Sequence, residues 1–90
     1  MYRDLVVPGS SFGRILEAAE GQRLPLLASL DRHGPRELDK GQAQDLAAEL
    51  TVLRSSGELI DVDDDLTSLA ELARWCVHAR EEAWLTIEGA

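Results

Sequence analysis

The chain has 90 residues and carries 17 acidic against nine basic side chains, which gives a formal net charge of −8 at pH 7. Hydrophobic residues make up 44% of the chain and charged residues 29%, a balance that predicts a single folded domain over residues 1–90. A single cysteine, no apolar run of membrane-spanning length and no signal-peptide-like start argue against a disulfide framework, a zinc finger and a membrane protein. We therefore expect a cytoplasmic protein.

The first two expected elements are a strand and a helix. Residues 2–7 are predicted to form a strand, because they contain two adjacent valines and a Pro-Gly pair follows them. A helix is expected over residues 11–20, with Ser10 or Ser11 as its N-cap. Its apolar positions have helical spacing and form one stripe, at Phe12, Ile15, Leu16 and Ala19.

The next segment has two interpretations. Residues 24–30 fit a short helix with Pro25 in its first turn or a buried extended segment, and we favour the helix. Residues 31–38 are expected to form a loop, since Gly34-Pro35 interrupts them.

The clearest predicted helix begins at Asp39 and ends at Arg54 or Ser55. Asp39 and Gln42 stand three positions apart, which is typical of a capping box. One side of this helix is apolar, at Ala43, Leu46, Ala47, Leu50 and Leu53.

An acidic connection over residues 56–65 leads to the last predicted helix, over about 66–82, with Asp64 or Asp65 as its cap. The apolar stripe of this helix is formed by Leu66, Leu69, Ala70, Ala73, Cys76 and Val77. The closing residues 84–87 are strand formers, with alternate side chains pointing in opposite directions.

These elements predict an α+β fold, with three main helices packed on a small sheet formed by the N- and C-terminal strands. The helices are expected to cover one face of the sheet, because an isolated pair of strands is barely stable in water. The alternative is an all-α bundle with extended tails.

The most prominent candidate site is a group of five carboxylates within eight positions, formed by Glu58, Asp61, Asp63, Asp64 and Asp65. The alternate aspartates resemble the first ligands of an EF-hand calcium loop. However, the sixth position is Leu66 instead of glycine and the twelfth is Leu72 instead of glutamate, so no metal site is predicted. Two other interpretations stay open, namely a solvated loop that caps the last helix and a contact surface for a cationic partner.

Three further side chains extend this candidate surface. Asp45 and Glu49 lie on the polar side of the helix that begins at Asp39. Trp75 lies about 140° from the centre of the last helix's stripe, where it could be a lid over the core, an interface anchor or part of a second buried face.

Arg80 is expected near the end of that helix, with its head group either in solvent or in a buried ion pair.

The distribution of charge argues against nucleic-acid and membrane binding, and the spacing of the candidate catalytic residues argues against an enzyme. Residues 45–90 hold eleven acids and three bases, and no cationic face is available for nucleic acid or an anionic membrane. Cys76 and His78 stand two positions apart, which on a helix separates their side chains by about 160° and excludes a local Cys–His pair. We expect a non-enzymatic protein without a cofactor.

Four segments follow one another along the chain: the opening YRDLVVPG, the Leu30-Asp31 pair, Gln42-x-x-x-Leu46-x-x-Glu49-Leu50 and the closing LTIEG. In this order they resemble small uncharacterised bacterial α+β proteins, some of toxin–immunity type. The resemblance implies a protein-binding inhibitor, and it assigns no binding residue.

We therefore expect a protein-binding module, of immunity type, that occludes a cationic partner through the acidic surface of residues 58–65, Asp45, Glu49 and Trp75. The second hypothesis is a homodimeric structural or scaffolding protein, because exposed strand edges favour pairing across a two-fold axis. The third is an enzyme, which would need a pocket where His78 and carboxylates converge.

Overall fold

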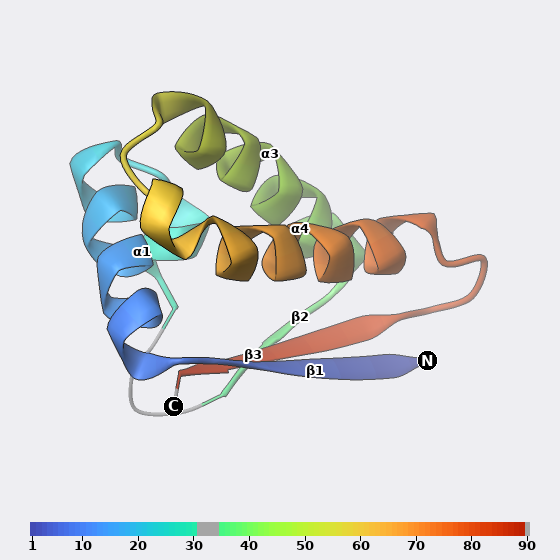
Figure 1. The fold of residues 1–90 in the computed structure, drawn as a ribbon. Helices are drawn as coiled ribbons and strands as arrows, with labels where there is room; N and C mark the ends of the chain where they lie inside the picture. Colours follow the sequence, from blue (N-terminus) through green and yellow to red (C-terminus); the bar gives the residue numbers. More distant parts are fainter. Residues whose placement is uncertain (31–34, 90) are drawn as a thin grey trace.

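The two ends of the chain meet as neighbouring strands of one sheet, as the sequence predicts (Figure 1). Strand β1 (Tyr2–Val7) pairs in parallel with strand β3 (Trp84–Gly89), so that Tyr2 lies opposite Trp84 and Val7 opposite Gly89. The structure is a computed structural model that describes residues 1–30 and 35–89. Its fold is α+β, with the helices packed on one face of the sheet.

A third strand, β2 (Arg36–Leu38), pairs antiparallel with the other edge of β3, which makes β3 the central strand. The predicted loop over residues 31–38 is therefore wrong for its last three residues, and its residues 31–34 lie outside the described part of the chain. Residues 36–38 are too few for an alternation of apolar and polar side chains to predict a strand. β3 supplies the hydrogen-bonding partner, and Leu38 is fully buried in the core.

Helix α1 (Gly9–Gly21) begins two residues earlier than the sequence predicts. The N-cap is Pro8, whose carbonyl accepts a hydrogen bond from the Phe12 N–H at 2.8 Å. The predicted N-cap at Ser10 or Ser11 is wrong, because proline restricts the backbone at the start of the helix and leaves both serines inside its first turn. The predicted stripe is confirmed, and Ser11 is buried beside it.

Two helices follow the sequence prediction closely. Within the segment 24–30, helix α2 (Pro25–Ala28) has proline at its first position, so the helical interpretation is confirmed for these four residues. Helix α3 (Lys40–Ser56) has a complete capping box. The Asp39 carboxylate accepts from the Gln42 N–H at 2.9 Å, and the Gln42 side-chain oxygen accepts from the Asp39 N–H at 3.1 Å. Gly57 ends α3 in the left-handed conformation, with φ of 74°.

The connection after α3 is more ordered than the sequence predicts. It contains a 3₁₀ turn (Ile60–Val62), and helix α4 (Asp63–His78) begins directly after it. The predicted cap at Asp64 or Asp65 is wrong, because both lie in the first turn of α4, whose N-cap is Val62. Leu59 and Val62 are buried, so apolar contacts hold the connection against the core.

Helix α4 also ends four residues before the predicted position, at His78. Ala79 is extended, with ψ of 136°, and the Lys40 ammonium donates a hydrogen bond to its carbonyl. The chain must turn here to bring Trp84 to the start of β1, where the Trp84 N–H donates to the Met1 carbonyl at 2.9 Å. Arg80 lies in this turn and is exposed, so the buried ion pair is wrong.

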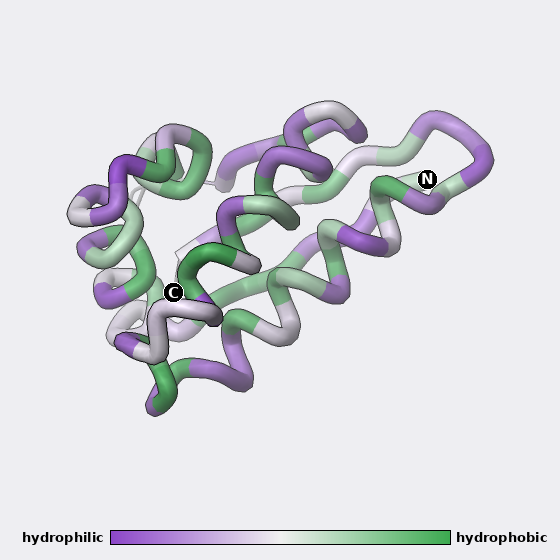
Figure 2. The backbone as a smooth tube through the Cα atoms, turned by 90° about the horizontal axis from the view of Figure 1, so that it is seen from above, coloured by the Kyte–Doolittle hydropathy of each residue, from purple (hydrophilic) through white to green (hydrophobic). Residues whose placement is uncertain are grey.

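The hydrophobic core lies between the sheet and the helices, and each main element contributes one row of buried side chains. Its largest members are Ile15, Leu27, Leu38, Leu46, Leu50, Leu53, Leu66, Leu69, Leu85 and Ile87. Figure 2 shows the corresponding pattern, in which green hydrophobic positions recur along the helices between purple hydrophilic ones. None of the described helices is long and apolar enough to cross a membrane.

Replacing Gly89 with alanine is expected to destabilise the protein by about 1–3 kcal/mol. A Cβ at Gly89 would lie 2.8 Å from Cδ1 and 3.1 Å from Cγ of Phe12, whose ring is buried where α1 meets the sheet. Urea denaturation followed by circular dichroism measures the effect. The matched control is Gly21→Ala at the end of α1, where nothing lies within 4 Å of the added carbon. We expect this control to be neutral or stabilising, and equal stabilities for the two variants would contradict the packing.

Candidate protein-binding surface

One face of the sheet is left open by the helices (Figure 1). Because side chains alternate along a strand, Leu85 and Ile87 point into the core and their neighbours point outward. The pairing register brings the outward positions of all three strands together. We call this surface the outer sheet face, and it consists of Tyr2, Asp4, Val6, Glu37, Trp84, Thr86 and Glu88.

The outer sheet face combines negative charge with exposed apolar groups. Asp4, Glu37 and Glu88 are exposed carboxylates, and most of the face lines a hollow of about 380 Å³. Tyr2 is 60% exposed and Val6 is 55% exposed, in the row beside Asp4. Over the ranges 1–30 and 35–89, no arginine, lysine or histidine lines this hollow. The face is therefore acidic and partly apolar, which suits a contact with a cationic surface.

The acidic segment predicted as the contact surface is partly neutralised by arginines. Asp61 forms an ion pair with Arg14 of α1, and Asp63 lies 3.5 Å from the Arg54 guanidinium of α3. Asp64 is exposed at the start of α4. Asp65, in the same turn, is half-buried. In the parts of the chain that the structure describes, no group of three His, Cys, Asp or Glu side chains is arranged to hold a metal ion.

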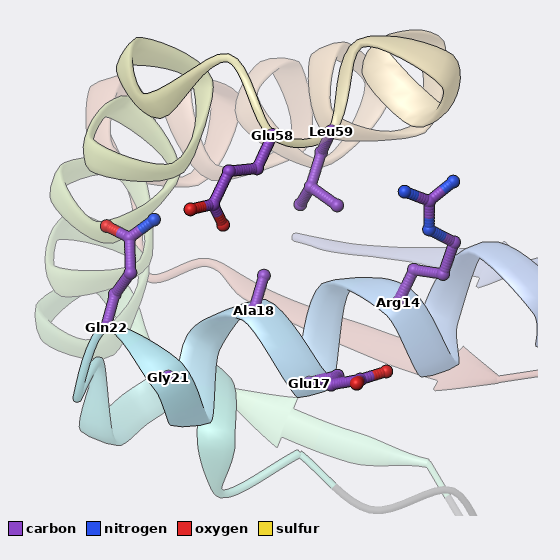
Figure 3. A pocket seen from close by; sticks show the side chains of 7 residues that line it. All are labelled: Arg14, Glu17, Ala18, Gly21, Gln22, Glu58 and Leu59. Carbon is purple, nitrogen blue, oxygen red and sulfur yellow. The ribbon is translucent and has the colours of Figure 1, made fainter.

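Glu58, the remaining acid of this segment, faces α1 across a hollow of about 440 Å³ (Figure 3). Figure 3 shows its carboxylate pointing toward α1 on the side of Gln22, while Arg14 stands at the opposite end of the hollow. Glu17 contributes a second carboxylate to the lining. This hollow carries both signs of charge, so it lacks the uniform acidity that the sequence suggests for residues 58–65.

Glu49 has a structural partner within the molecule. Its two carboxylate oxygens accept hydrogen bonds from the backbone N–H groups of Leu26 at 3.1 Å and Leu27 at 2.8 Å, in the first turn of α2. An anionic acceptor at a helix N-terminus stabilises both the free N–H groups and the helix dipole. Asp45 lies one turn away on α3 and is exposed. The sequence placed both acids on the polar side of α3 and gave no sign that one of them holds α2.

Trp75 lies on the helix side of the sheet, away from the outer sheet face. It is half-buried against the core, and the Arg3 guanidinium lies 4.7 Å from its ring centroid. Leu72, one turn earlier, is buried, so this flank of α4 is a second packing face. The structure thus does not bring Trp75 together with the acids of residues 58–65, and its role at an interface stays a prediction.

Sequence reasoning missed the carboxylates of the outer sheet face as a group. Asp4 and Glu88 lie near opposite ends of the chain, and only the parallel pairing of β1 with β3 makes them neighbours. The alternation of residues 2–7 and 84–88 was a usable signal for both of them. Glu37 has no such signal, because the sequence around it predicts a loop instead of a strand.

The Cys76 thiol and the His78 imidazole lie in different environments, the first buried and the second exposed. Burial raises the pKa of the Cys76 thiol above its ordinary value, while the Lys40 ammonium lowers it and the Asp39 carboxylate raises it. The thiol lies 3.5 Å from the Ala83 carbonyl, to which it donates. A buried and protonated thiol is a poor nucleophile. His78 is exposed at the end of α4.

Together these features define a class of structure, a two-layer α+β protein with one open, acidic sheet face. Comparison of the chain with protein-family models, curated proteins and solved structures finds no match.

Proposed function

We propose that this protein is a non-enzymatic protein-binding module that binds a cationic partner through its outer sheet face. The observation that carries the proposal is the gathering of Asp4, Glu37 and Glu88 on a sheet face that none of the described helices covers. Exposed Tyr2 and half-buried Trp84 add aromatic contact area, which is enriched where protein interfaces bind most strongly. The carboxylates would steer a basic partner and set its orientation.

The form of this function that we favour is an inhibitor of immunity type, which occludes the working surface of a basic toxin or nuclease. A formal charge of −8 on 90 residues supports fast association with such a partner. The resemblance of the sequence to small uncharacterised bacterial α+β proteins, some of toxin–immunity type, is in line with this proposal. The earlier candidate surface at residues 58–65 competes with the outer sheet face for this role, although two of its acids already pair with arginines.

The test compares two triple variants that change the net charge equally. Asp4→Asn, Glu37→Gln and Glu88→Gln remove the acids of the outer sheet face, and Asp61→Asn, Asp63→Asn and Asp64→Asn are the matched control. A basic protein captured by the wild type at low salt from its native lysate is identified by mass spectrometry, and its association rate is then measured. We expect the first triple variant to slow association about tenfold or more and the control to change it far less.

The reverse pattern would assign the contact to residues 58–65 instead of the outer sheet face. If both triple variants slowed association equally, the interaction would depend on net charge alone and not on either surface. If neither variant changed association and rising salt left it unchanged, binding through an acidic surface would be wrong.

A homodimer is the second candidate function, and one observation favours it. In the strand order β1-β3-β2 of the described residues, β1 is an edge strand, so the backbone groups along its outer edge are available for pairing with a second copy. Two copies each carrying −8 would repel, so salt should strengthen a dimer while it weakens binding of a basic partner. Sedimentation equilibrium at low and high salt separates the two. A monomer at every concentration would exclude the dimer.

A further inference from the structure

A second surface has the opposite charge to the outer sheet face. Helices α3 and α4 pack side by side and leave a hollow of about 200 Å³ between their exposed flanks. Arg54 of α3 lines it together with Arg74 and His78 of α4. Its apolar lining includes Ala47, Ala70 and Val77. Among residues 1–30 and 35–89, no aspartate or glutamate is part of this lining.

The concentration of cationic groups here is notable for so acidic a chain. Of the nine lysines and arginines in the sequence, Arg54 and Arg74 both line this small hollow, and His78 lines it as well. The Arg54 charge is partly balanced by Asp63, at 3.5 Å. Over the described ranges, Arg74 and His78 have no carboxylate within ion-pairing distance. Their N–H donors are therefore available to an anion from outside the chain.

We propose that the hollow between α3 and α4 binds a small organic carboxylate with a short apolar body. A guanidinium presents paired N–H donors that match the two oxygens of a carboxylate. The alanine and valine side chains would cover the apolar part of the same molecule. A volume of about 200 Å³ lies below the roughly 300–1,000 Å³ of common ligand pockets, so the ligand must be small. This site is independent of the outer sheet face and of the proposed protein partner.

The experiment is an NMR titration of the ¹⁵N-labelled full chain with hexanoate at constant ionic strength. Hexanol and inorganic phosphate are the two comparison probes, since hexanol lacks the charge and phosphate lacks the apolar body. We expect saturable shifts of backbone signals around Ala47, Thr51, Ala70 and Arg74 with hexanoate. Both comparison probes should produce weaker shifts at the same concentration.

Three variants test where hexanoate binds. Arg74→Gln should raise the hexanoate dissociation constant about tenfold, because a charge-assisted hydrogen bond is lost. Arg23→Gln makes the same charge change at an exposed residue outside the hollow and should leave the constant unchanged. Ala70→Leu keeps every charge and fills the hollow, so it should abolish saturable binding. Circular dichroism checks that each variant remains folded.

Three results would overturn the proposal. Hexanoate-induced shifts at arginines all over the chain would show that the protein attracts anions in general. Equal increases of the dissociation constant in Arg74→Gln and Arg23→Gln would show the same. If phosphate produced the same shifts as hexanoate, the apolar lining would not contribute to binding. Undiminished binding in folded Ala70→Leu would place hexanoate outside this hollow.

Discussion

Replacing Ile87 with alanine is expected to lower the free energy of unfolding by about 3–4 kcal/mol, the largest effect we predict for one substitution. Ile87 is 1% exposed and lies on the central strand β3, opposite Leu5 of β1 and Arg36 of β2. Its truncation removes buried methyl groups and leaves a cavity under the helices. Small domains are stable by about 5–15 kcal/mol, so this one change would remove much of the total.

The matched control for Ile87→Ala is Thr86→Ala, one position earlier on the same strand. Thr86 is half-buried on the outer sheet face, where no helix packs against it. We expect its truncation to cost less than about 1 kcal/mol. Urea denaturation measures both variants, and unchanged denaturant slopes would show that the unfolding transition is comparable. Similar losses for the two would contradict the assignment of one strand face to the core and the other to solvent.

Replacing Glu49 with alanine is expected to destabilise the protein by about 2–3 kcal/mol. The Glu49 carboxylate accepts two backbone hydrogen bonds from the start of α2, and its loss leaves the N–H groups of Leu26 and Leu27 without this acceptor. Hydrogen bonds to a charged group contribute more than neutral ones. Glu49→Gln should fall between wild type and alanine, because an amide offers one acceptor oxygen instead of two.

Asp45→Ala is the control for the Glu49 series. Asp45 is an exposed acid on the same helix, so its removal changes the charge equally without removing a bond to α2. We expect an effect within about 0.5 kcal/mol. Thermal or urea unfolding of each variant is measured without any partner. Replacing a residue that only contacts a partner protein would leave the free energy of unfolding unchanged. Equal stabilities of Glu49→Ala and Asp45→Ala would thus contradict the structural role of Glu49.

The pattern of the sequence by itself determined the elements whose information is local. The stripes of α1, α3 and α4 follow from helical spacing, and the capping box at the start of α3 follows from two residues three positions apart. The β-branched ends of the chain indicated β1 and β3. An apolar stripe must be buried for the chain to fold, so these features led directly to helices packed on a sheet of terminal strands.

The tertiary structure alone decided the features that depend on distant partners. β2 is a strand because β3 offers it a free edge, and α4 ends at His78 because the chain must return to pair with β1. The same holds for the candidate surface. The sequence predicts Glu49 as a surface acid, whereas in the fold it binds the start of α2, and the acids of the outer sheet face meet through strand pairing. The periodicity of apolar residues indicates which side of a helix or strand is buried. Which other element packs against that side, or completes a site with it, is decided by the packing of the whole chain.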